Sequence, residues 1–306
     1  MGNHTEMDSN SPVVVGTYSR EMNLRLPSGE VVRAKIKGKK LKPVCGDRVQ
    51  ASPIENEPLW LITGIDKRDN ELTRPNMRGQ IEILAANLDF LCVVAANTPA
   101  VDWFIVDRYL CAAELMNIDA AVVYNKAELD SDPGPTTEAL RVYKDIGYAT
   151  VRCSAELRQN IDELGQVLAH KTSIIVGQSG VGKSSIINVL SAVANQKTNT
   201  VSKSTGEGRH TTVNSVMIDI ADGGRVIDSP GVRDYAPTTQ TNEQVATSFR
   251  EIKNMSYECR FANCQHLQEP NCAVKEAVES GGISRRRYES YRRLIVLSEQ
   301  LSKKRV

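Results

Sequence analysis

The stretch Gly177-Gln178-Ser179-Gly180-Val181-Gly182-Lys183-Ser184 fits the phosphate-loop pattern G-x-x-x-x-G-K-[ST] at every fixed position. The apolar run 173–176 precedes it and a helical run begins at Ser185, so the pattern has the strand–loop–helix context that it needs. The glycines allow several backbone N–H groups to face one point, where the positive end of the helix also attracts phosphate oxygens. The stretch therefore predicts a bound nucleotide, with Lys183 reaching the β and γ phosphates and the Ser184 hydroxyl on Mg²⁺.

A second motif, Asn125-Lys126-Ala127-Glu128, follows the apolar run 120–124 and predicts that the base is guanine. In the N-K-x-D pattern the acidic side chain accepts hydrogen bonds from N1–H and the 2-amino group of guanine, and adenine cannot offer both donors. Glu128 stands where the pattern has aspartate, so the reach of the carboxylate changes, while we expect guanine specificity to persist. Ser154-Ala155, after the strand-like run 149–153, fits the short motif that backs the base.

Two further segments fit the parts of a GTPase that respond to the γ-phosphate. Residues 225–231 form a predicted strand ending in D-x-P-G, in which Asp228 would hold Mg²⁺ through water and the Gly231 N–H would sense the γ-phosphate. The pair Thr211-Thr212 would supply a second Mg²⁺ hydroxyl. We favour Thr212 from its distance to the following strand, and Thr211 remains the alternative.

The order of these motifs differs from that of ordinary GTPases, in which the base-reading motif follows the phosphate loop. Here the base-reading and base-backing motifs come first, and the phosphate loop and the two switches follow. This order is a circular permutation, which changes connections and leaves contacts intact, so one site can still close. From residue 88 onward, apolar strands alternate with amphipathic helices, which favours a doubly wound α/β domain around a parallel sheet.

The residues before this domain predict a small barrel. Five short strand-like segments occur at residues 13–18, 23–26, 31–36, 46–49 and 59–63. They favour an antiparallel barrel of the OB type, with an SH3-like barrel as the alternative. We therefore expect a multidomain α/β protein with four parts: a disordered leader at 1–12, the barrel at 13–70, the permuted GTPase domain at 71–236 and an α-helical, zinc-binding domain at 237–306.

Three of the seven cysteines lie close together near the C-terminus with a histidine among them, as Cys259, Cys264, His266 and Cys272. Three thiolates and one imidazole form a closed set suited to one structural Zn²⁺. The spacing is not the common C-x2-C, so a reduced cysteine-rich loop is the alternative. The other cysteines are expected to be buried free thiols, which suits a reducing cytoplasm: Cys45, Cys92, Cys111 and Cys153.

Composition excludes several classes of protein and points to a partner. The chain has 306 residues, 41% of them hydrophobic, and no run approaches the roughly 20 apolar residues that cross a bilayer. The first ten residues are polar, so we expect neither export nor a membrane partner. The net charge of +1 hides two basic ends, which indicate either a polyanionic partner or two solvated faces. Their basic residues are Arg33, Lys35, Lys37, Lys39, Lys40, Lys42, Arg48, Arg285, Arg286, Arg287, Arg292, Arg293, Lys303, Lys304 and Arg305.

Across residues 13–300 the chain resembles the ribosome small-subunit-dependent GTPase A family, also called the YjeQ family. The resemblance rests on the metal-ligand string and on four motifs: NKAE at 125–128, GQSGVGKSS at 177–185, GRHTT at 208–212 and DSPGVRDY at 228–235. It implies an OB barrel, a permuted GTPase domain and a zinc-binding helical domain. It also implies a role in late maturation of the small (30S) ribosomal subunit, with 16S rRNA as the partner of a monomeric protein. Glu128 is the departure at a motif position.

The residue after D-x-P-G bears on hydrolysis. Many GTPases have a glutamine there that orients the attacking water, whereas Val232 cannot position water, so intrinsic turnover should be slow. His210, beside the Mg²⁺ threonine, is the candidate to orient or activate water, together with Lys183 and Thr212 in catalysis. A histidine that only hydrogen-bonds the loop is the alternative. The resemblance implies a slow GTPase stimulated by the small subunit, which agrees with this reading.

Three rival functions remain open from the sequence. A P-loop ATPase or kinase would need an adenine site in place of the guanine motif. A non-catalytic RNA-binding module is disfavoured by the intact Lys183, Ser184 and Asp228. A permuted GTPase that acts on the large subunit, or on another RNA target, is disfavoured by the barrel and the cysteine–histidine set.

We predict that His210→Ala retains nucleotide binding and loses the turnover stimulated by the small subunit, because water would no longer be oriented. Phosphate release with and without small subunits measures the effect, and binding of labelled GDP controls for an intact site. Unchanged stimulated turnover would remove His210 from the mechanism.

Overall fold

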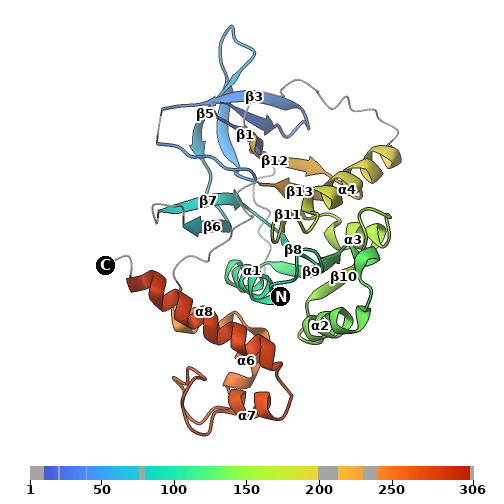
Figure 1. Cartoon of the computed structure of the whole chain (residues 1–306). Coiled ribbons are helices and arrows are strands. Elements are labelled where there is room, and N and C mark those ends of the chain that lie inside the picture. The colour runs from blue at the N-terminus through green and yellow to red at the C-terminus, as the bar shows by residue number, and fades with distance from the viewer. Residues whose placement is uncertain are drawn as a thin grey trace.

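The structure, a computed structural model, describes residues 10–19, 21–38, 40–75, 80–198, 213–229 and 240–303 (Figure 1). Its strands are β1 (Val13–Tyr18), β2 (Met22–Arg25), β3 (Val31–Ile36), β4 (Val49–Pro53), β5 (Trp60–Ile65), β6 (Glu71–Pro75), β7 (Ile81–Ala86), β8 (Phe90–Ala96), β9 (Asp119–Asn125), β10 (Ala149–Arg152), β11 (Thr172–Val176), β12 (Val213–Asp219) and β13 (Arg225–Asp228). Its helices are α1 (Trp103–Met116), α2 (Pro133–Asp145), α3 (Ile161–Leu168), α4 (Lys183–Thr198), α5 (Asn242–Thr247), α6 (Arg250–Ser256), α7 (Ala273–Glu279) and α8 (Arg285–Lys303), with a 3-10 helix at Ala127–Leu129.

The central domain is a doubly wound α/β sheet, as the sequence predicts. Its parallel strands run in the order β10-β9-β8-β11-β13. All seven residues of β8 are buried, because alternate side chains pack into separate cores on the two faces of the sheet. One core contains α1 and α2, and the other contains α3 and α4. The carboxyl ends of the parallel strands therefore share one edge, which is where ligands bind in such sheets.

The barrel is of the OB type. Its strands pair in the order β1-β2-β3-β5-β4, with β3 and β5 parallel, and a bridge between Val13 and Arg48 brings the last strand back to the first. The barrel core is small and apolar, and it includes Leu24, Ala34 and Ile62. The fourth strand begins at Val49, later than the sequence pattern predicts. The residues just before it, 44–47, form a loop instead, which we call the docking loop.

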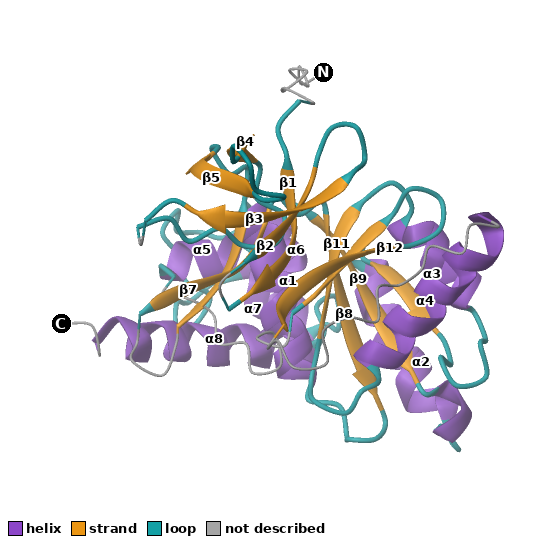
Figure 2. Cartoon of the chain, turned by 90° about the horizontal axis from the view of Figure 1, so that it is seen from above, coloured by secondary structure: helices purple, strands orange, loops and turns teal. Residues whose placement is uncertain are grey.

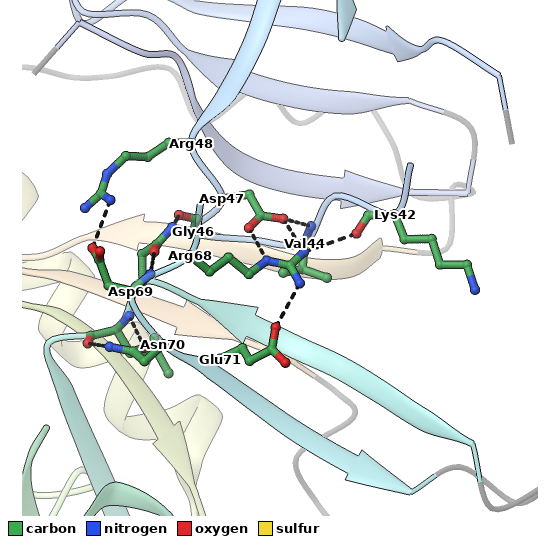
Figure 3. Close-up of polar contacts among 11 residues, drawn as sticks. Lys42, Val44, Gly46, Asp47, Arg48, Arg68, Asp69, Asn70 and Glu71 are labelled. Atoms are coloured by element: carbon green, nitrogen blue, oxygen red, sulfur yellow. Dashed lines mark hydrogen bonds and ion pairs between the residues drawn. The ribbon is translucent and has the colours of Figure 1, made fainter. Parts of the chain in front are cut away.

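A buried ion pair fixes that docking loop to the segment entering the central domain (Figure 3). Asp47 is fully buried and accepts hydrogen bonds from Arg68 Nε at 2.7 Å and Nη2 at 2.8 Å, and from the Val44 N–H at 2.8 Å. The hydrogen bond with Asp47 raises the pKa of the Arg68 guanidinium above its ordinary value. Gly46 lies so close to the Ala86 carbonyl that a Cβ would collide with it. The barrel is thus held in one orientation beside β8.

The barrel and the central domain also share one continuous sheet (Figure 2). β12 pairs antiparallel with β13 on one side and antiparallel with β1 on the other. The strand order therefore runs without a break from β10 through β12 and β1 to β4.

The C-terminal helices form their own core and dock on α1 through a buried charge cluster. Arg287 on α8 is 1% exposed and donates to Asp107 on α1 at 2.8 Å and to both oxygens of Glu251 on α6, at 2.7 and 3.0 Å. Burial alone would lower the pKa of Arg287, but Asp107 and Glu251 outweigh burial and hold the pKa well above its ordinary value. Tyr143 donates to the same Asp107 at 2.7 Å.

This placement corrects part of the expectation for the C-terminal basic residues. Arg287 is neither a solvated residue nor a contact for a polyanion, since its guanidinium is buried and forms ion pairs with Asp107 and Glu251. Arg286 also pairs with Asp107, at 3.3 Å, and lies over the Trp103 ring. The one-dimensional charge pattern does not distinguish such inward-facing arginines from their exposed neighbours.

We predict that Arg287→Met destabilises the docked helices by about 3 kcal/mol or more, because it leaves Asp107 and Glu251 buried without their cation. Arg292→Met, on the exposed side of the same helix and paired with the exposed Glu289 at 3.3 Å, should cost about 0.5 kcal/mol or less. Urea denaturation followed by Trp103 fluorescence in a Trp60→Phe background measures both, because the chain has two tryptophans. Equal costs for the two variants would show that the buried cluster is not a stabilising contact.

Candidate functional site

The phosphate loop connects β11 to α4 at the carboxyl edge of the central sheet. Gly177, Gly180 and Gly182 all have positive φ, at 139°, 82° and 93°. A Cβ at Gly177 would collide with the Val94 carbonyl of the neighbouring strand, and a Cβ at Gly182 would collide with the Asn125 side chain. The loop therefore needs glycine both for its backbone conformation and for its close packing.

Asn125 closes the site by joining three separate segments. Its Nδ2 donates to the Val181 carbonyl in the phosphate loop at 2.9 Å, and its Oδ1 accepts from the Ala155 N–H at 3.0 Å. Lys126, with a left-handed backbone, donates from Nζ to the carbonyls of Gly180 at 2.7 Å and Thr98 at 2.8 Å. The base-reading motif, the base-backing motif and the phosphate loop thus meet as predicted from the sequence.

On the side of the site where the sequence predicts the guanine base, one carboxylate is exposed to solvent. Glu128 lies in the exposed 3-10 helix that follows β9, and it forms no hydrogen bond or ion pair with another described residue. Burial first, and then the charge of Glu128, raise the pKa of the neighbouring Cys153 thiol to about 12. Ser154 is buried, and its Oγ accepts from the Leu157 N–H at 3.0 Å, which fixes the backing turn.

The phosphate side presents Lys183 and exposed hydroxyls. Lys183 Nζ donates to the carbonyls of Gly177 and Gln178, both at 2.7 Å, so the ammonium group lies over the loop. Ser179 precedes Lys183 in the loop, Ser184 and Ser185 follow it at the start of α4, and all three serines are exposed. The Gln178 side chain accepts from the Asp102 N–H at 3.2 Å, a contact with the start of α1 that the sequence did not reveal.

Asp228 ends β13 at the same edge as the phosphate loop, since β13 lies beside β11. Its carboxylate and the Ser184 hydroxyl are hard oxygen donors of the kind that Mg²⁺ takes, so the donor set fits that ion. The remaining predicted switch residues lie outside the described residues: His210, Thr211, Thr212, Gly231 and Val232.

The four predicted metal ligands come together in the C-terminal domain. The ligand atoms of Cys259, Cys264, His266 and Cys272 all lie within 4.8 Å of one another. His266 Nδ1 is 3.5 Å from the Sγ atoms of both Cys259 and Cys272, and those two sulfur atoms are 3.9 Å apart. His266 and Cys272 are buried. Three sulfur atoms and one nitrogen atom at this spacing can enclose a single metal ion.

Neighbouring side chains that the sequence did not single out hold this loop in place. Tyr288 and Tyr291 on α8 donate from their hydroxyls to the carbonyls of His266 and Gln265, both at 2.6 Å. The Glu269 carboxylate accepts from three loop N–H groups, at 2.9 to 3.0 Å. The sequence signal for such residues is weak, because two tyrosines at helical spacing are more often interpreted as residues of the hydrophobic core.

The other four cysteines are free and buried, as expected, so they take no part in this centre. Burial raises the pKa values of the Cys45 and Cys111 thiols to about 12. None of the described helices is long and apolar enough to span a membrane.

Comparison with known proteins finds a family whose members are similar to this chain. The family model described as RsgA GTPase matches residues 65–237. A protein of Actinobacillus pleuropneumoniae serotype 5b, named small ribosomal subunit biogenesis GTPase RsgA, is 37% identical over 299 residues, which are 96% of this chain and 87% of that protein. A Haemophilus influenzae protein of the same name is 38% identical over 304 residues, 97% of this chain and 88% of that protein.

Two solved structures are similar throughout. YjeQ from Thermotoga maritima matches with a TM-score of 0.76 and 30% identity, covering 94% of this chain and 98% of that one. YloQ, a circularly permuted GTPase, matches with a TM-score of 0.74 and 24% identity over 98% of each chain, which shows a shared fold. The permuted connectivity expected from the motif order is thus a connectivity known in solved structures.

We predict that the purified protein carries one metal ion per chain, which the sulfur-rich ligand set predicts to be Zn²⁺. Chelation, or Cys264→Ser, should remove it and make residues 257–272 sensitive to protease, because the loop has little core of its own. Elemental analysis and limited proteolysis measure the two effects, and Cys45→Ser, in the barrel loop, should keep the metal. A metal-free loop as resistant to protease as the untreated one would contradict the prediction.

Proposed function

The chain belongs to the RsgA GTPase family, and from that premise we propose that it hydrolyses GTP on the small (30S) ribosomal subunit and assists late maturation of that subunit. The observation that carries the proposal is the pair of hydrogen bonds by which Asn125 joins the phosphate loop, at Val181, to the turn at Ala155. The relatives named above are small-subunit biogenesis GTPases and match nearly the whole chain, flanking domains included.

The roles of the site residues follow from their positions. Glu128 would accept hydrogen bonds from the guanine edge. The aliphatic stem of Lys126 would lie against the base, and its ammonium group donates to the carbonyls of Gly180 in the phosphate loop and of Thr98. Lys183 would leave the loop carbonyls for the phosphates. The residues proposed to bind nucleotide are Asn125, Lys126, Glu128, Ser154, Ala155, Gly177, Gln178, Ser179, Gly180, Val181, Gly182, Lys183, Ser184, Ser185, Thr211, Thr212, Asp228 and Gly231.

Mg²⁺, when bound, would supply charge neutralisation for the phosphate oxygens, held by Ser184, Thr212 and Asp228. Zn²⁺ would have a structural role, held by Cys259, Cys264, His266 and Cys272. Hydrolysis itself would be slow without the ribosome, since Val232 cannot orient water and His210 is proposed to do so when the small subunit is bound.

The outward face of the barrel is suited to 16S rRNA. Arg33 and Lys35 are exposed on β3, and their partners Glu21 and Glu57 lie 3.5 and 3.3 Å away. Exposed ion pairs of this kind contribute little, so phosphate groups can replace the carboxylates. Of the C-terminal basic residues, Arg285, Arg292 and Arg293 are exposed on α8 and would add a second contact. We propose that the protein acts there as a monomer in the cytoplasm.

The decisive experiment is GTP hydrolysis with purified small and large subunits in parallel. We expect slow turnover alone, stimulation of at least about tenfold by small subunits, and none by large subunits, because His210 is proposed to orient water only with the correct partner bound. Subunit binding should weaken as salt rises, because phosphate contacts release counterions.

Competition between labelled GDP and ADP serves as the control for base identity. Equal binding of the two nucleotides would favour a P-loop ATPase or kinase. Stimulation by the large subunit instead of the small one would redirect the function to another ribosomal target.

A further inference from the structure

β12 is the strand shared by the barrel and the nucleotide site. We call the pairing of β1, β12 and β13 the seam, because it joins the barrel to the central sheet. In one row of facing residues, Gly16 on β1 faces Val216 on β12, which faces Asp228 on β13. In the next row, Thr17 on β1 faces Ser215 on β12. The carboxylate proposed to hold Mg²⁺ is therefore one strand away from the barrel.

Support for Asp228 comes from β12 rather than from the centre of the sheet. The parallel pairing of β13 with β11 ends at Ile227, opposite Ile174, whereas the pairing with β12 continues to Asp228. At the end of β13, the last ladder partner among the described residues is thus the strand that also carries the barrel.

A buried hydroxyl pair extends this support by one residue. Ser215 Oγ on β12 lies 3.0 Å from Ser229 Oγ, and both serines are buried, at 6% and 4% exposure. Thr17, opposite Ser215 on the barrel strand, is buried as well. A hydrogen bond between buried groups is costly to break, because the remaining partner loses solvation without compensation.

The seam is reinforced at its far end. Arg25 on β2 donates from Nη1 and Nη2 to the two oxygens of Asp219, at 2.8 and 2.6 Å, and so joins the barrel to the end of β12. A bidentate arginine–carboxylate pair fixes orientation as well as distance. This contact and the strand pairing thus join β12 to two strands of the barrel, β1 and β2.

We propose that Ser215 is a positioning residue for the Asp228–Ser229 segment, and that the barrel, through β1 and Arg25, forms part of the support of the Mg²⁺ side of the nucleotide site. This inference rests on the proposed function for the role of Asp228. Its consequence is reciprocal: a ligand that shifts the barrel changes the affinity for Mg²⁺-nucleotide, and Mg²⁺-nucleotide changes the affinity of the barrel by the same factor.

The first test compares Ser215→Ala with Ser173→Ala. Ser173 is a fully buried serine of the same sheet, on β11, whose hydroxyl has no hydrogen-bond partner among the described residues. The measurement is the dissociation constant of a labelled, non-hydrolysable GTP analogue, with and without Mg²⁺. The effect of Mg²⁺ is expressed as the ratio of Kd in EDTA to Kd in Mg²⁺. We expect Ser215→Ala to reduce this ratio about threefold to tenfold, and Ser173→Ala to leave it unchanged.

Two further readouts separate positioning from general damage. Ser215→Thr keeps the hydroxyl on a strand-favouring residue and should restore the ratio. Hydrogen exchange of the nucleotide-free protein should be faster at residues 226–229 in Ser215→Ala alone. If Ser215→Ala matched Ser173→Ala in both the ratio and the exchange, the role of Ser215 would be refuted.

The second test addresses the barrel. Arg25→Ala should reduce the same Mg²⁺ ratio about twofold or more, because the bidentate contact is lost. Arg74→Ala breaks a comparable arginine–carboxylate pair, with Glu82 at 3.0 Å, on the paired strands β6 and β7 away from β12, and should leave the ratio unchanged. Equal ratios for these two variants would refute the proposal that the barrel supports the Mg²⁺ side of the nucleotide site. All these measurements omit ribosomes, so they stand or fall separately from stimulation by the small subunit.

Discussion

The structure depends on a single side-chain amide, that of Asn125, which ties the phosphate loop to the base-backing turn. Its two hydrogen bonds connect segments that the permuted chain order separates, and they are made between buried groups, where a missing partner is costly. Gly182 must lack a Cβ to admit this amide. Because the site is closed by non-covalent contacts, the chain can be cut and rejoined elsewhere in evolution without opening it.

Around this site the flanking domains are fixed by buried charge. Asp47 and Arg68 hold the barrel, and Arg287 with Asp107 and Glu251 holds the C-terminal helices. Apolar surfaces alone would bring these domains together in several orientations, whereas a paired buried charge is satisfied in few. Both flanking domains can therefore present a fixed geometry to a large, rigid partner.

Much of this architecture could be predicted from the sequence, because its signals are local. The glycines of the phosphate loop and the apolar run of β8 each lie within seven residues, and the cysteine–histidine set spans 14 residues. Arg287 could not be told from Arg292, since only the tertiary fold decides which arginine faces inward. Likewise, the pairing of β1 with β12 and of Ser215 with Ser229 joins residues whose types carry no local sign of a partner.

One turn of α8 has two tasks that are chemically unrelated. Tyr288 and Tyr291 hold the carbonyls of the metal loop, while the adjacent Arg287 enters the charge cluster on α1. A metal bound by these four ligands and the docking of the C-terminal domain would therefore be linked equilibria that share one helix. The factor by which docking would lower the dissociation constant of the metal equals the factor by which the metal would strengthen docking, so metal retention would report on domain assembly.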